Sequence, residues 1–163
     1  MKTSSASSET PLRSSLAWQA EAILEQRRRQ QLRIEQHAAT IEGWRKDFVA
    51  FAAELDVIDK DGVRIPIRPT PMLTSFEEQR SGRDIVLKPR QVYFTTWELA
   101  RDLWFWLTQG GAHVVVLCQS DKDQNAVREL VQRTKVMLGL DTAGTGRGLI
   151  GKHPWLAAEI GWY

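Results

Sequence analysis

The chain has 163 residues, a formal net charge of +2 and one cysteine. This length suits a single domain with a sizeable core and leaves room for an extended arm, while a lone cysteine excludes a disulfide framework. The sequence has no apolar run of about 18 residues and no apolar leader, so we expect a cytoplasmic protein without membrane contacts. Its mild positive charge neither requires nor excludes a nucleic-acid partner.

The N-terminal part is predicted to be a helical arm. Residues 1–14 are rich in Ser and Thr and are expected to be disordered, whereas residues 15–56 have no proline, one glycine and many Ala, Glu, Gln and Arg. An arginine cluster in the earlier half is either a solvated helix face or a contact for phosphate groups or a subunit. The later half carries an apolar stripe: Ile34, Ile41, Trp44, Phe48, Phe51 and Leu55. This stripe can pack on the rest of the chain or on a partner helix, so self-association through the arm is one hypothesis.

An α/β domain is predicted over residues 57–138. It opens with a small hairpin, because the Asp-Gly pair at residues 61–62 lies between two short β-branched runs. A proline-rich connection over residues 66–72 follows. The later part alternates between apolar runs typical of buried parallel strands, at residues 84–87 and 113–118, and two amphipathic helices.

The two helices of this β-α-β-α run have predicted bounds. The hydroxyls of Thr95 and Thr96 are expected to cap the first helix, which is rich in aromatic residues and ends at Gly110. The second starts at Ser120 or Asp121 and ends at Gly139. Its inward-facing residues are predicted to be Val127, Leu130, Val131, Met137 and Leu138. Residues 88–94 form the loop before the first helix, where free backbone amides and the positive end of the helix dipole favour phosphate groups.

The order of residues in this loop resembles the large subunit of the tailed-phage DNA-packaging terminase, over about residues 63–138. Many members of that family carry a loop of the form Lys-x-Arg-Gln-x-Gly-x-Ser/Thr-Thr, with the functional lysine at its start. The matching residues of this chain are Lys88, Arg90, Gln91, Thr95 and Thr96. The resemblance implies a partial P-loop NTPase fold in which these five residues bind ATP and Thr95 also holds Mg²⁺. It also implies double-stranded DNA and other terminase or portal subunits as partners, in the cytoplasm of a bacterial host.

One position departs from that pattern. Tyr93 stands where the family has glycine. A bulky side chain is costly there if the backbone takes a positive φ or a phosphate approaches closely. The loop is either a tolerated variant or a decayed site in which Tyr93 packs over the loop. Gln79, some distance after the proline-rich connection, is either an exposed helix residue or the amide that reads the adenine edge.

The sequence lacks the groups that would hydrolyse ATP. A packaging motor needs an apolar strand that ends in Asp-Glu, one carboxylate for Mg²⁺ and one to activate water, and no such strand is present. The nuclease domain of the family is also missing, so the chain resembles roughly the first third of a motor, either a shortened prophage copy or a cut fragment. The three histidines have no metal-ligand spacing. Residues 139–163 are glycine-rich at their start and are expected to form an irregular tail.

The predicted fold class is therefore α/β, with a long N-terminal helical arm followed by a partial P-loop NTPase β-α-β-α sheet. The predicted function is that of a terminase large-subunit fragment, which binds nucleotide without hydrolysing it. The alternative is a non-enzymatic interaction protein that associates through its N-terminal amphipathic helix. A helicase-like fragment shares the same strand-loop-helix start and would need the same missing acidic strand.

Overall fold

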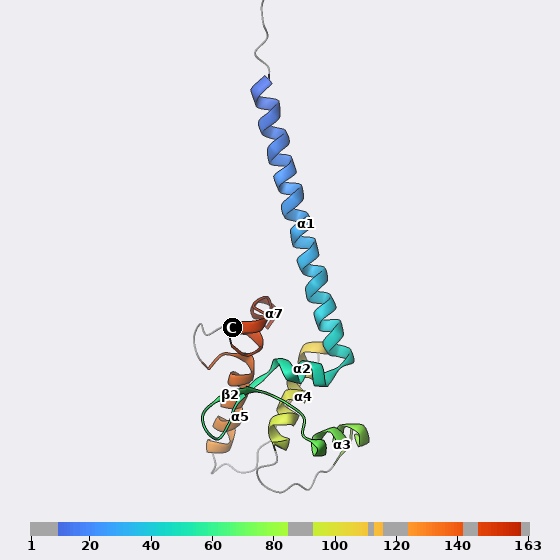
Figure 1. Cartoon of the computed structure of the whole chain (residues 1–163), viewed down its shortest axis with the longest axis vertical. Coiled ribbons are helices and arrows are strands. Elements are labelled where there is room, and N and C mark those ends of the chain that lie inside the picture. Colours follow the sequence, from blue (N-terminus) through green and yellow to red (C-terminus); the bar gives the residue numbers. More distant parts are fainter. Residues whose placement is uncertain (1–9, 85–92, 111–112, 116–123, 142–146, 161–163) are drawn as a thin grey trace, which may run out of the picture. The chain divides into compact units, whose positions relative to one another are not determined.

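The computed structural model describes residues 10–84, 93–110, 113–115, 124–141 and 147–160. The chain divides into two units, residues 1–40 and 41–163. Within the described ranges the chain is mostly helical and has one small two-stranded antiparallel sheet (Figure 1). None of the helices in these ranges is both long and apolar enough to span a bilayer.

The long N-terminal helix is confirmed. Helix α1 (Thr10–Lys46) forms most of the first unit and its last turns belong to the second. It does not continue to residue 56, because Asp47 has an extended backbone (φ −137°, ψ 98°) and starts a new helix, α2 (Phe48–Glu54). The Asp47 carboxylate accepts a hydrogen bond of 3.0 Å from the backbone N–H of Ala50, which is a side-chain N-cap.

The apolar stripe of the predicted arm is largely used inside the second unit. Its members from residue 44 onward are buried in the core: Trp44, Phe48, Phe51 and Leu55. Ile41 is partly buried against the same core, whereas Ile34 lies in the first unit and is 54% exposed. Trp44 and Phe51 meet edge to face, with ring centroids 5.4 Å apart. The stripe from Ile41 to Leu55 is therefore covered by the chain's own residues.

The predicted hairpin is confirmed. Strands β1 (Asp56–Ile58) and β2 (Arg64–Pro66) pair antiparallel, with Val57 opposite Ile65. The turn is closed by Asp59, whose carboxylate oxygen Oδ1 accepts hydrogen bonds from the N–H groups of Asp61 (2.9 Å) and Val63 (2.8 Å). Gly62 has φ 77°, the left-handed conformation that glycine adopts without strain and that makes the Asp-Gly pair typical of turns.

Three longer helices complete the core of the second unit: α3 (Pro71–Gln79), α4 (Phe94–Thr108) and α5 (Gln124–Leu138). Helix α4 buries the apolar side chains Trp97, Leu99, Ala100 and Leu103. Helix α5 buries Met137 and Leu138 as predicted. Its first turns differ from the prediction, because Val127 and Val131 are each about half exposed.

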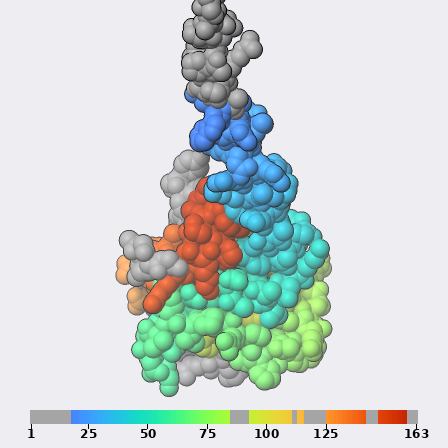
Figure 2. Space-filling model, turned by 45° about the horizontal axis from the view of Figure 1, so that its top comes forward, coloured from blue at the N-terminus to red at the C-terminus, as the bar shows by residue number. Residues whose placement is uncertain are grey.

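Residues 147–160, expected to belong to an irregular tail, carry two short helices, α6 (Gly148–Lys152) and α7 (Leu156–Ile160). Their side chains Leu149 and Leu156 are almost fully buried in the core. Figure 2 shows this segment in red beside residues of α2, and Lys152 Nζ donates to the backbone oxygen of Glu54 at 2.6 Å. The C-terminal segment thus stabilises the second unit.

The predicted P-loop NTPase sheet is not seen in the described residues. Most of the two predicted strands, residues 85–87 and 116–118, lies outside the described ranges. The described remainder, Asp84 and residues 113–115, is not strand, and Val115 is 78% exposed. A short apolar run predicts burial, but it forms a strand only if neighbouring strands pair with it.

Candidate functional site

The candidate phosphate-binding residues lie around the start of α4. Lys88, Arg90 and Gln91 fall outside the described residues, so the structure places only Thr95 and Thr96. The two threonines do not cap the helix as predicted. Tyr93 is the N-cap residue and makes no side-chain capping hydrogen bond, and its backbone oxygen accepts the first helical bond, 3.0 Å from the N–H of Trp97. Both threonines therefore belong to the first turn of α4, in which there is no acidic side chain.

Tyr93 has the backbone conformation that glycine favours. Its φ is 60° and its ψ is −1°, and it is the one residue other than glycine with a positive φ in the described part of the chain. Its side chain is 42% exposed. The left-handed conformation costs an L-residue about 1–2 kcal/mol, most of all a bulky one. The tyrosine at this position is therefore strained.

We predict that Tyr93→Gly is more stable than Tyr93→Ala by about 1 kcal/mol. Both variants remove the aromatic ring, so the loss of ring contacts is the same in each. Only glycine relieves the left-handed strain. Urea unfolding followed by circular dichroism measures the difference. An alanine variant at least as stable as the glycine variant would show that the positive φ is not maintained in solution.

Thr96 is held by a residue that sequence reasoning missed. Its side chain is 5% exposed, and its Oγ1 accepts a 2.9 Å hydrogen bond from Nη1 of Arg133 on α5. Arg133 also pairs with Glu129, one turn earlier in its own helix. A cation thus lies next to the first turn of α4. No local pattern could have found it, because the two residues are 37 positions apart in the sequence.

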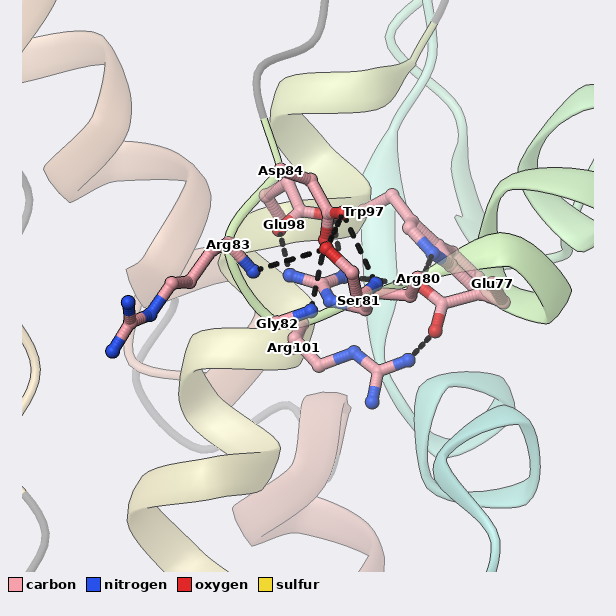
Figure 3. Close-up of polar contacts among 9 residues, drawn as sticks. All are labelled: Glu77, Arg80, Ser81, Gly82, Arg83, Asp84, Trp97, Glu98 and Arg101. Atoms are coloured by element: carbon pink, nitrogen blue, oxygen red, sulfur yellow. Dashed lines mark hydrogen bonds and ion pairs between the residues drawn. The ribbon is translucent and has the colours of Figure 1, made fainter.

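A polar cluster centred on Glu77 joins α3 to α4 (Figure 3). The Glu77 carboxylate accepts a 2.7 Å hydrogen bond from Nε1 of Trp97 and pairs with the guanidinium of Arg101. Arg80, at the end of α3, binds both carboxylate oxygens of Glu98 through two hydrogen bonds of 3.0 and 2.7 Å. Paired bonds of this kind fix direction as well as distance, so they set the position of α3 against α4.

Burial and charge shift the pKa values in this cluster. Burial lowers the pKa of Arg101, whose guanidinium carbon lies 3.8 Å from the centroid of the Phe48 ring. The hydrogen bond to Glu98 is the main cause of the raised pKa of Arg80. The pKa of Asp102 is raised, first by burial and then by the negative charge of Glu98. The cluster is best explained as structural, because its hydrogen bonds and ion pairs join α3 to α4.

The chain leaves α3 through a tight turn at Ser81. Asp84 Oδ1 accepts hydrogen bonds from the backbone N–H (3.0 Å) and hydroxyl (2.6 Å) of Ser81, and Oδ2 accepts one of 3.2 Å from the N–H of Gly82. The hydrogen bond from the Ser81 hydroxyl is the main cause of the lowered pKa of Asp84, and the bonds from the two backbone N–H groups lower this pKa further. These bonds fix the backbone of residues 81–84 after the end of α3.

An open pocket of about 680 Å³ lies between this turn and the start of α4. It is lined by Phe76, Arg80, Gly82, Arg83, Asp84, Phe94 and Glu98. Two of the lining rings, those of Phe76 and Phe94, meet edge to face, with centroids 4.9 Å apart. Gln79 is not among the lining residues. It is exposed, and its amide Nε2 donates to the Ser75 hydroxyl at 2.9 Å, so it is a surface residue of helix α3.

Within the described residues, no group of three or more His, Cys, Asp or Glu side chains could hold a metal ion. Comparison of the chain with protein-family models, with curated proteins and with solved structures found no match.

Proposed function

We propose that the chain is related to the large subunit of the tailed-phage DNA-packaging terminase and that residues 88–96 bind the phosphates of ATP. The observation that carries the proposal is the backbone of Tyr93. At the position where the family has glycine, this chain has φ 60°, directly before the helix whose first turn contains Thr95 and Thr96. This conformation is uncommon for a tyrosine, whereas glycine, the residue of the family at this position, adopts it without strain.

In this role each residue of the loop has a defined task. Lys88 and Arg90 would balance the phosphate charges, and the backbone N–H groups from Gln91 to Thr95 would surround the phosphate oxygens. The Thr95 hydroxyl would be a ligand of Mg²⁺. Thr96 would anchor the first turn of the helix through its hydrogen bond from Arg133.

The proposed activity is binding and not turnover. The sequence lacks the apolar strand ending in Asp-Glu that would supply a magnesium ligand and a base for the attacking water. Double-stranded DNA and other terminase or portal subunits are the partners that the family resemblance suggests, in the cytoplasm of a bacterial host.

Isothermal titration with ATP and Mg²⁺ tests the proposal. We expect saturable binding that Lys88→Ala weakens roughly 10- to 100-fold, because a charged hydrogen bond to phosphate contributes about 1.5–3 kcal/mol. Lys60→Ala is the matched control, since Lys60 is an exposed lysine in the hairpin turn of the same unit. If ATP gives no saturable heat, or if the two variants bind it equally, residues 88–96 are not a nucleotide site.

A second candidate function is that of an interaction protein. It is favoured by the large apolar side chains that are at least half exposed along the first unit: Trp18, Ile23, Leu24, Leu32 and Ile34. Because the stripe from Ile41 to Leu55 is buried in the second unit, the contact surface would be α1 between residues 18 and 40. Most of the stability of helices in proteins comes from packing of an apolar face, so a covering partner would also stabilise this one.

A further inference from the structure

One side of α1 carries four residues in steps of four, three and four: Ile23, Arg27, Gln30 and Ile34. These steps keep them in one row along the helix. All four are exposed within the first unit, and Ile23 and Ile34 are 52% and 54% exposed. The row continues, seven residues after Ile34, at Ile41, which packs on the core of the second unit. The row is thus an extension of a face that is already used for packing.

The order of the four residues reads the same in both directions, as apolar, polar, polar, apolar. When the same helix of a second copy lies alongside in the opposite direction, Ile23 meets Ile34 of the second copy and Arg27 meets Gln30 of the second copy. The apolar residues then bury each other, and the Gln30 amide oxygen can accept from the Arg27 guanidinium. Each side chain finds a partner of matching chemistry.

The parallel arrangement of two copies lacks this match. It would place Arg27 against Arg27 of the second copy, two like charges in a row that is removed from water. The neighbouring basic residues do not disturb the antiparallel arrangement, since Arg28 and Arg29 lie on the other side of the helix at about 100° per residue. Arg29 is moreover paired within its own helix, 2.9 Å from the Glu25 carboxylate.

We infer that two copies of this chain associate through antiparallel pairing of α1 between residues 18 and 40, with the two-fold axis between Arg28 and Arg29. The inference rests on the second candidate function and names its partner as a second copy. It does not depend on nucleotide binding, because it uses no residue of the loop or of α4. Such a contact is isologous, so that the same surface is buried on both copies.

Site-specific disulfide formation tests the direction of pairing in the full chain, with Cys118→Ser in every variant. An equimolar mixture of Ile23→Cys and Ile34→Cys should form a mixed disulfide dimer, whereas Ile23→Cys alone should not, because cross-linking requires Cα atoms within about 7 Å. Gln36→Cys, on the opposite side of the helix, is the control and should remain reduced when mixed with either variant. Efficient cross-linking of Ile23→Cys with itself would overturn the antiparallel assignment.

Sedimentation of the unmodified chain over a concentration series provides the second measurement. We expect a reversible monomer–dimer equilibrium that Arg27→Leu tightens at least tenfold, because the central polar pairs become apolar. A chain that is monomeric at every concentration, or an association that Arg27→Leu leaves unchanged, would overturn the inference. The ATP titration is unaffected by either result, so the two proposals fail separately.

Discussion

Replacing Glu77 by alanine is expected to lower the free energy of unfolding by about 3 kcal/mol, since removal of one member of a buried ion pair typically costs about 3–5 kcal/mol. The side chains of Glu77 and Arg101 are 15% and 19% exposed. Loss of the carboxylate leaves the Arg101 charge between Phe48 and Trp104 without its partner. It also removes the acceptor for Nε1 of Trp97. Chemical unfolding followed by tryptophan fluorescence measures the loss.

Two further variants sharpen this test. Glu78→Ala removes the same side chain one position later, where it is exposed, and should change the stability by less than about 0.5 kcal/mol. Glu77→Gln keeps an acceptor for Trp97 but loses the charge that Arg101 needs, so its stability should lie between those of the alanine variant and the natural chain. Equal effects of Glu77→Ala and Glu78→Ala would mean that the cluster does not hold α3 in place.

The second large effect is expected at Gly148. This residue has φ 69°, and a Cβ atom added to it would lie 2.4 Å from the backbone nitrogen and 2.6 Å from the Cα of Gly139. Backbone atoms cannot rotate out of the way, so Gly148→Ala must separate the end of α5 from the start of α6. We expect a loss of about 3–4 kcal/mol, the sum of overpacking and left-handed strain.

Gly62→Ala is the matched control for this prediction. Gly62 has φ 77° but nothing within 4 Å of its added Cβ, so alanine there incurs the conformational cost alone, about 1–2 kcal/mol. Thermal unfolding of both variants separates the two effects. The contact between Gly139 and Gly148 is not tight in solution if both substitutions lower the stability equally.

Gly148 also shows how the C-terminal segment is joined to the hairpin. Its N–H donates a 3.1 Å hydrogen bond to Oδ2 of Asp56, a side chain that is buried in β1. Oδ1 of the same carboxylate lies 3.2 Å from Nζ of Lys152. Each oxygen of this carboxylate thus has a hydrogen-bond donor, which offsets the free-energy cost of removing the carboxylate from water. This arrangement helps to explain why a segment expected to be irregular belongs to the core.

The features predicted correctly from sequence are those that short stretches specify. The hairpin follows from an Asp-Gly pair between β-branched residues, and the long helix from a segment without proline. The resemblance to a loop with glycine at the position of Tyr93 stays a prediction, and the structure shows only that Tyr93 has a positive φ. The roles of Lys88, Arg90 and Gln91 stay predictions, since these residues lie outside the described part of the chain.

The sequence by itself determined the hairpin and the long first helix, because each depends on neighbours within a few residues. Only the tertiary structure decided that the apolar stripe after Ile41 is covered by the chain's own core, and that Glu77 faces Arg101 and Arg133 reaches Thr96. These pairs join residues far apart along the chain. Their meeting depends on how helices pack, and packing minimises the free energy of the whole unit and not of any one segment.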